Sequence, residues 1–108
     1  MQLEIQFKFN ELIDNVKEWA DAKDILKPEN APKQMMKVME ELGETAGAIA
    51  KNKKTEEIQD GIGDTFVTLI ILAYQLRLEP AACLEHAWNE IKNRKGNTVN
   101  GVFIKDEN

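Results

Sequence analysis

Apolar residues recur at steps of three and four along most of the chain, which is the spacing of amphipathic helices. Asn10 is suited to cap a first helix that ends before Pro28. The apolar stripe of this helix consists of Ile13, Val16, Trp19 and Ala20. A polar loop over 23–31 leads to Pro32, which favours the first turn of a second helix ending near Asn52. The stripe of the second helix consists of Met35, Val38, Met39, Leu42, Ala46 and Ile49.

The second half of the chain predicts two more helices. Thr55 can cap a third helix that runs to Gln75 or Arg77, and its segment 65–74 is apolar around nearly the whole circumference, which predicts a buried helix. Pro80 opens a fourth helix that Gly96 closes. Its inner stripe consists of Leu84, Ala87, Trp88 and Ile91. Four helices with short links predict an all-α fold, an up-and-down four-helix bundle.

The two ends of the chain follow a different pattern. Residues 3–9 alternate apolar and polar side chains, which by itself predicts a short strand. Near the other end, the dipeptide Asn100-Gly101 favours a hairpin turn before the apolar residues 102–104. We therefore expect short extended N- and C-terminal segments, which either pair with each other or are simply extended.

Composition narrows the class of protein. A chain of 108 residues, 43% hydrophobic, predicts a single domain over 1–108 with a modest core that partner subunits would enlarge. The net charge of −5 argues against nucleic acid or an anionic membrane as a partner. Cys83 is alone, so it forms no intramolecular disulfide, and we expect it in the core. The longest apolar run is shorter than the roughly 20 residues that span a bilayer, and a cytoplasmic protein is expected.

Five carboxylates flank or interrupt the two most apolar predicted helices. They are Glu40, Glu41, Glu44, Asp60 and Asp64. Asp64 is the costliest, because it leads directly into the apolar segment 65–74, where an ionised carboxylate needs a partner. Glu41 and Glu44 fall on one strip of the second helix, while Glu40 lies around its far edge. Asp60 and Asp64 are one turn apart on the third helix.

If the second and third helices pack antiparallel, the two pairs of acids meet across a groove. Like charges at that distance repel unless a divalent cation bridges them, and hard oxygen ligands suit Mg²⁺ or Mn²⁺. Four glycines lie beside the acids, each at a cost of about 0.5–1 kcal/mol in a helix interior. They are Gly43, Gly47, Gly61 and Gly63. Close approach of the two backbones would explain them; the alternative is that Gly61 and Gly63 mark a break between helices.

Two motifs carry a family resemblance. They read Gln34-x-x-Lys37-x-x-Glu40-Glu41-x-Gly43-Glu44 and, before an apolar helix, Asp60-x-x-Gly63-Asp64. These motifs resemble those of the MazG-like nucleoside triphosphate pyrophosphohydrolases, an all-α family. The resemblance extends from about residue 19 to the tail, where 87–96 is similar to the basic closing segment of many small members. It implies a single MazG-like all-α domain that completes its bundle by forming a homodimer or homotetramer.

The resemblance also implies site residues. The family has two adjacent glutamates, a third glutamate three residues on, and later a glutamate three residues before an aspartate. When this motif is carried over to the present chain, it implies that Mg²⁺ is bound by Glu41, Glu44 and Asp64, and that Mn²⁺ can substitute for it. Glu40 and Glu41 are catalytic, Glu40 as an outer ligand or as the group that orients the attacking water. Gly61 stands where the family has its later glutamate, and Asp60 is the expected substitute ligand, since residues four apart share a helix face.

The implied reaction is hydrolysis of the bond between the α- and β-phosphates of a nucleoside triphosphate, giving a monophosphate and pyrophosphate. The expected role of this reaction is house-cleaning of the nucleotide pool. A metal would lower the pKa of a bound water, and a carboxylate would accept its proton. Lys37 and a basic cluster would hold the phosphates, Trp19 would stack on the base, and Asn89 would contact the nucleotide. The basic cluster consists of Lys92, Arg94 and Lys95.

Each of these side chains also has an ordinary structural interpretation. Acids on a helix are most often a solvated face, and Trp19 and Trp88 are by default core residues. Lys92, Arg94 and Lys95 also lie in the last turn of the fourth helix, where cations stabilise the helix dipole.

Two other functions compete with the hydrolase. One is a non-catalytic helical interaction module with an acidic surface, whose Met-rich face binds a partner. The other is a di-iron carboxylate bundle, which needs Glu-x-x-His on two helices. The single His86 has Cys83 three residues before it, so that motif is absent, and we expect His86 to be exposed.

Overall fold

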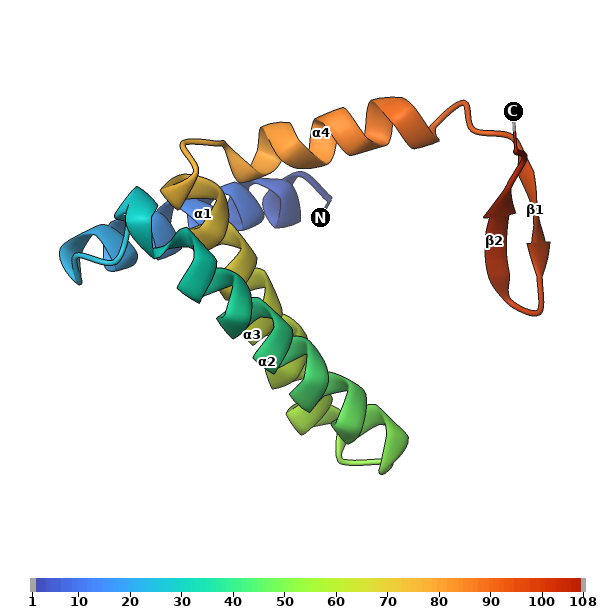
Figure 1. The fold of residues 1–108 in the computed structure, drawn as a ribbon, viewed down its shortest axis with the longest axis horizontal. Helices are drawn as coiled ribbons and strands as arrows, with labels where there is room; N and C mark the ends of the chain where they lie inside the picture. Colours follow the sequence, from blue (N-terminus) through green and yellow to red (C-terminus); the bar gives the residue numbers. More distant parts are fainter. Residues whose placement is uncertain (1, 108) are drawn as a thin grey trace.

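A computed structural model describes the backbone of residues 2–107 and the side chains of residues 8–107. Four helices are followed by a hairpin (Figure 1). The helices are α1 (Gln2–Ala22), α2 (Ala31–Ala50), α3 (Thr55–Gln75) and α4 (Pro80–Ile91), with a short 3-10 turn, η1 (Pro28–Asn30), ahead of α2. The hairpin consists of β1 (Gly96–Val99) and β2 (Val102–Lys105). A mostly helical fold is therefore confirmed.

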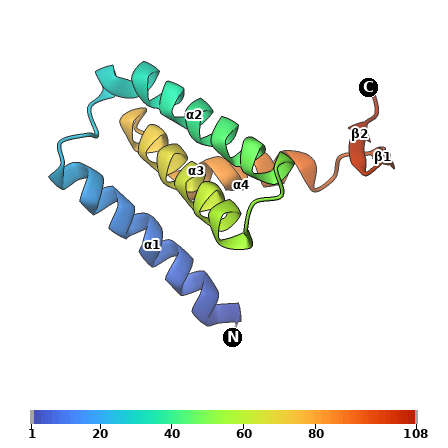
Figure 2. The ribbon, with the colours of Figure 1, turned by 90° about the horizontal axis from the view of Figure 1, so that it is seen from below.

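Helices α2 and α3 form an antiparallel pair that lies side by side in both views (Figure 1, Figure 2). Val38 of α2 is almost fully buried, and the Gln34 side-chain amide donates a hydrogen bond of 3.1 Å to the Thr68 carbonyl of α3. Helix α1 packs on α3, where the Phe9 and Phe66 rings meet edge to face at 6.1 Å between centroids. Gln75, at the end of α3, is fully buried and donates to the Ile25 carbonyl in the loop after α1. These contacts hold the first three helices together.

Three helices end in the same way, with a residue in the left-handed region that is not glycine. These residues are Asp24 (φ 59°), Asn52 (φ 54°) and Arg77 (φ 61°). In each case the following N–H bonds to a carbonyl five residues back, which is the Schellman arrangement. The bonds run from Ile25 to Ala20, from Lys53 to Ala48 and from Leu78 to Ala73. Each cap ends its helix and fixes the direction of the chain that follows.

Helix α4 leaves α3 at an angle of 100° and projects away from the other helices (Figure 1). Residues 81–95 are all exposed. A single chain therefore does not close an up-and-down bundle, and completion of the bundle by a second chain stays a prediction. None of the described helices is by itself long and apolar enough to cross a membrane; α3 and α4 reach that length and composition only when counted together, across their bend.

The core of the single chain is small. Its buried apolar residues among those described are Ile13, Ala20, Ala31, Val38, Ile70 and Ile71. The prediction that 65–74 is buried all round is wrong for the isolated chain, because Phe66 is 50% and Leu69 is 45% exposed. Trp88 is 55% exposed, and Cys83 is exposed as well, so neither is a core residue of one chain. A stripe pattern predicts which face of a helix is apolar, but not which chain covers it.

The predicted strand over 3–9 is wrong, because the described backbone is helical from Gln2 and Asn10 is not a cap. The period-two alternation covers only seven residues. The same stretch also starts a helical series, since apolar residues stand at 5, 9, 13, 16 and 20, at steps of four, four, three and four. The continuous series into the longer helix decides the local structure.

The tail forms its own hairpin. Gly96 pairs with Lys105 and Val99 with Val102, and both Asn100 and Gly101 have positive φ, as a type I′ turn requires. The expected turn is thus confirmed, whereas pairing with the N-terminal segment is not found. Gly96 does not close α4, which ends at Ile91; it begins β1, where a Cβ would lie against the Ile104 carbonyl. Thr55 is likewise the first residue of α3, not its cap.

Candidate functional site

Acidic residues of α2 and α3 act on Glu41 along the seam where the two helices pack, and we call this seam the acidic groove. Glu41 is a partly exposed residue, and its pKa is raised above the ordinary value first by desolvation and then by the charges of other carboxylates. Those charges belong to Glu44 and Asp64, with a further contribution from Glu40. Lys37, one turn earlier on α2, acts in the opposite direction. The fold thus brings together three glutamates of α2 and one aspartate of α3.

Close contact between the two helices positions these acids. A Cβ placed on Gly61 would lie 2.5 Å from the Thr45 hydroxyl oxygen of α2, closer than side chains pack. The Thr45 hydroxyl donates to the Glu41 carbonyl at 2.8 Å, and the Thr65 hydroxyl donates to the Gly61 carbonyl at 2.9 Å. Gly61 is therefore required by the approach of Thr45, and a glutamate at this position would have to displace that side chain.

The other glycines beside the acids do not share this role. A Cβ on Gly43, Gly47 or Gly63 would meet nothing within 4 Å. The expectation that close helix packing explains all four glycines is wrong for these three. Helix α3 also runs unbroken from Thr55 to Gln75, so Gly61 and Gly63 do not mark a break.

Asp60 is placed differently from Asp64. Both are exposed, but only Asp64 is among the charges that raise the pKa of Glu41. Asp60 precedes Asp64 by four residues, and the neighbouring Gly61 is the position turned towards α2. Asp60 therefore fits a weaker, outer contact to an ion held by the other acids.

The donor set of the groove suits a hard divalent cation, since it consists of carboxylates. Within the described residues, no three His, Cys, Asp or Glu side chains stand close enough to hold a metal ion together. Glu44 and Asp64 are exposed, so their side chains are free to rotate towards Glu41. The residues fit such an ion by chemistry and by helix face, and binding would require that rotation.

The residues expected to bind substrate are spread over the molecule. Lys37 lies next to the acids, with its Nζ 3.9 Å from Glu40 Oε2. Trp19 on α1 is 53% exposed, so it is not a core residue of the single chain. Asn89 accepts a hydrogen bond of 3.1 Å from Lys92 at the end of α4. The structure does not bring this end of α4 to the acids of the same chain (Figure 1).

The basic cluster was expected in the last turn of α4, and the structure places it beyond that turn. The helix ends at Ile91, so Lys92 is its C-cap, while Arg94 and Lys95 lie in the link to β1. A cation stabilises the helix dipole only within about the last turn of a helix, so this interaction explains little about the positions of Arg94 and Lys95. His86 is exposed, as expected, and its Nε2 lies 3.4 Å from Glu90 Oε1.

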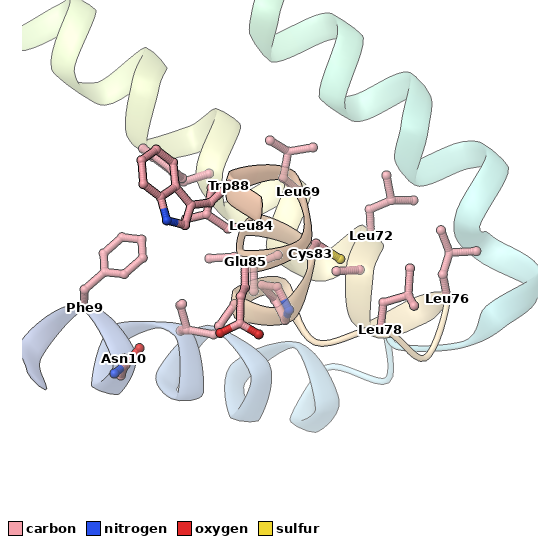
Figure 3. Close-up of a pocket in the computed structure, with 16 residues that line it drawn as sticks. Phe9, Asn10, Leu69, Leu72, Leu76, Leu78, Cys83, Leu84, Glu85 and Trp88 are labelled. Carbon is pink, nitrogen blue, oxygen red and sulfur yellow. The ribbon is translucent and has the colours of Figure 1, made fainter. Parts of the chain in front are cut away.

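An apolar groove lies on the other side of α3, and the sequence did not predict it. It has a volume of about 820 Å³ and runs between α1, α3 and α4 (Figure 3). Its wall includes Phe9, Phe66, Leu69, Leu84 and Trp88. Asp64 and Phe66 are two residues apart on α3, which at about 100° per residue points them in nearly opposite directions. A sequence signal for this groove did exist. The segment 65–74 is apolar around nearly its whole circumference, so α3 has a second apolar face besides the one that packs on α2.

Comparison with known proteins gives one informative relation. The chain is 41% identical over 69 residues to an uncharacterized 18.2 kDa protein from the rep-hol intergenic region of Haemophilus phage HP1 (strain HP1c1). The aligned region is 64% of this chain and 42% of the phage protein, so the chain spans less than half of that relative's length. No protein-family model matches the chain. No solved structure matches it either.

Proposed function

We propose that this chain is a Mg²⁺-dependent nucleoside triphosphate pyrophosphohydrolase whose active site is the acidic groove between α2 and α3. The observation that carries the proposal is the position of Glu41 at the α2–α3 seam, where desolvation and then the charges of Glu44, Asp64 and Glu40 raise its pKa. Gathering like charges in this way opposes folding, and such groups concentrate at functional sites. The family resemblance of the same residues supplies the reaction.

Glu41, Glu44 and Asp64 would hold Mg²⁺, or Mn²⁺ in its place, and Asp60 would contribute through a water. The bound ion would neutralise phosphate oxygens and lower the pKa of a water molecule. Glu40 lies at the edge of the Glu41/Glu44 strip beside Lys37, where a carboxylate can orient the attacking water. Lys37 would in turn hold a phosphate oxygen as a point charge.

The proposed step is a substitution at the α-phosphorus. The oxygen of water forms a bond to this atom, while the bond between the α-phosphorus and the α–β bridging oxygen breaks. The electron pair of that bond leaves with pyrophosphate, and the proton of the water passes to Glu40 or Glu41. The products are a nucleoside monophosphate and pyrophosphate, which fits removal of nucleotides from the pool.

The test is release of pyrophosphate from a panel of canonical, deoxy and modified nucleoside triphosphates, with Mg²⁺ or Mn²⁺. Glu41→Gln and Asp64→Asn are expected to lower the rate about 100-fold or more, because each removes a charge from the groove. Glu57→Gln is the matched control, since Glu57 is an exposed acid in the first turn of α3. Circular dichroism should show the same helix content in all three variants. Full activity of both groove variants would contradict the site.

The alternative is a non-catalytic helical interaction module. The exposed apolar groove between α1, α3 and α4 favours it, because a surface of this kind marks a contact with another protein. Absence of turnover with either metal over the whole panel would support the module and reject the hydrolase.

A further inference from the structure

Thr45 of α2 meets Gly61 of α3 with its whole side chain. A Cβ placed on Gly61 would lie 2.5 Å from the Oγ1, 3.2 Å from the Cβ and 3.3 Å from the Cγ2 of Thr45. Because two branches of the side chain are this close, turning Thr45 about its own Cα–Cβ bond would leave one of them against the same position. Position 61 is thus closed by a side chain of the other helix.

The Thr45 hydroxyl ties this contact to the turn that carries Glu41. It donates a hydrogen bond of 2.8 Å to the Glu41 carbonyl, while the Thr65 hydroxyl donates one of 2.9 Å to the Gly61 carbonyl. A threonine in a helix has few side-chain rotamers, and a bond to the carbonyl four residues back selects one of them. The Thr45 Oγ1 is therefore held between the Glu41 turn of α2 and the Gly61 turn of α3.

The same contact sets the levels of the acids along the helix pair. Because α2 and α3 run antiparallel (Figure 2), residues after Gly61 lie beside residues before Thr45. Measured along the pair from the Thr45–Gly61 contact, Glu44 stands about 1.5 Å away, Asp64 about 4.5 Å and Glu41 about 6 Å, all to the same side. Asp64 is thus level with the stretch of α2 between the two glutamates.

Asp60 stands on the other side of the contact. It precedes Gly61 by one residue, which places it about 6 Å from Asp64 along the helix axis. This separation agrees with the charges that act on Glu41, since Asp64 is one of them and Asp60 is not. The expected substitute ligand is therefore separated from the other acids by the contact itself.

A metal ion makes the distance between the two helices important. Mg²⁺ requires a near-octahedral set of oxygens at about 2.0–2.1 Å, so carboxylates from two helices meet on one ion only over a narrow range of helix separations. Side chains at the contact decide the separation of packed helices, which is about 8–10 Å between their axes. Groups that support metal ligands from behind change metal affinity by about 10- to 100-fold when they are replaced.

We propose that Thr45 is a positioning residue for the metal ion of the acidic groove. Its contact with Gly61 sets the distance between the glutamates of α2 and Asp64 of α3, and it closes position 61 to a further inner carboxylate. Glu41, Glu44 and Asp64 then hold the ion on one side of the contact, and Asp60 stays outside. This role rests on the proposed function, because it requires the metal site, whereas the packing of Thr45 on Gly61 does not.

Binding of Mn²⁺ without nucleotide, measured by calorimetry, tests this role without any activity measurement. Thr45→Ala should weaken binding about 10-fold, whereas Thr45→Ser keeps the Oγ1 and should stay within about threefold of wild type. Thr68→Ala is the matched control, because the Thr68 hydroxyl likewise bonds to a carbonyl of its own helix, that of Thr65, at 2.8 Å. Unchanged affinity of a folded Thr45→Ala chain, or equal weakening by Thr45→Ser or Thr68→Ala, would overturn the proposal.

A carboxylate introduced at position 61 tests whether Thr45 closes it. Gly61→Glu alone should bind Mn²⁺ no more tightly than wild type, because the new side chain and Thr45 need the same space. Thr45→Ala opens that space, so the double variant should bind about 10-fold more tightly than Gly61→Glu. Gly61→Gln with Thr45→Ala is the control, since it fills the space without a charge and should gain nothing. Tighter binding by Gly61→Glu alone would show that position 61 is open and would overturn the proposal.

The positioning role and the hydrolase fail separately. A wild-type chain that binds Mn²⁺ with this pattern of variants but releases no pyrophosphate rejects the hydrolase and retains the role of Thr45. An active chain whose Mn²⁺ affinity is unchanged by Thr45→Ala retains the hydrolase and rejects that role. In active chains, excess Mn²⁺ should recover the kcat of Thr45→Ala, because Thr45 acts through the ion; a loss of kcat that excess Mn²⁺ does not recover contradicts the proposal. A wild-type chain that binds no Mn²⁺ rejects both.

Discussion

The α2–α3 pair and the arm, by which we mean α4 and the hairpin (residues 80–105), differ in what holds each of them in place. The pair is fixed within one chain by the packing of Thr45 against Gly61 and by the hydrogen bond from Gln34 to the Thr68 carbonyl. Among the described residues, the arm packs on its own chain mainly through α4 against α3, and its residues from 81 to 95 are exposed. One chain thus brings the acids of α2 and α3 together by its own packing, whereas the apolar and basic residues of the arm stay exposed.

The largest expected effect tests the dimer that the family resemblance implies, with the apolar groove as its expected interface. Leu84→Glu places a charge in the apolar groove, and in a two-fold dimer it does so twice. We expect dimer dissociation to become easier by about 4 kcal/mol, roughly 1,000-fold in the dissociation constant. Sedimentation equilibrium measures this shift. His86→Glu, on the same helix but not in the lining of the groove, is the control and should leave the constant within a few fold.

The next largest effect is expected on the free energy of unfolding, from a change at the buried end of α3. Gln75 is fully buried, and its Oε1 has no hydrogen-bond partner among the described residues. Gln75→Glu keeps the shape but buries a charge, which should lower the free energy of unfolding by about 3 kcal/mol at neutral pH. Chemical unfolding at a fixed chain concentration measures it, since dimerisation adds to apparent stability. Gln59→Glu, exposed on the same helix, is the control; equal loss in both variants would contradict the role of Gln75.

These positions also show what could be predicted from the sequence. Pro32, Thr55 and Pro80 each lie in the first turn of a helix, so local signals found the starts of α2, α3 and α4 to within one residue. Helical spacing likewise grouped Glu41 with Glu44 and placed Asp64 across from them. The exposure of Trp88 and the packing of Thr45 on Gly61 depend on contacts between segments far apart in the chain. Local patterns do not contain that information.

A smaller effect on stability is expected from alanine at two glycines of α3, with opposite signs at the two positions. Gly61→Ala forces its Cβ against the Thr45 hydroxyl and should cost about 1–2 kcal/mol of stability. Gly63→Ala has open space around it and should instead stabilise the helix by about 0.5–1 kcal/mol. Thermal unfolding of both variants gives the comparison. Adding Thr45→Ala to Gly61→Ala should restore part of the loss; stabilisation by both single changes would show that α2 and α3 do not approach closely here.

The smallest expected effect concerns the corner that directs the arm. Arg77 has φ 61°, a conformation that costs a non-glycine residue free energy. Arg77→Gly should raise the free energy of unfolding by about 0.5–1 kcal/mol without changing the dimer. Asn52→Gly is the matched comparison, because asparagine tolerates this conformation better and should gain less. A loss of stability in Arg77→Gly would indicate that the Arg77 side chain, and not the backbone cap, fixes the corner.

In the proposed reaction, the acidic groove directs water to the α-phosphorus of a nucleoside triphosphate. The most direct measurement is hydrolysis in water labelled with heavy oxygen, with Mg²⁺ present, followed by mass spectrometry of both products. Because water would attack the α-phosphorus, we expect the label in the nucleoside monophosphate, and Asp64→Asn should form neither product at a comparable rate. Label in the pyrophosphate, or unchanged hydrolysis by Asp64→Asn, would contradict it.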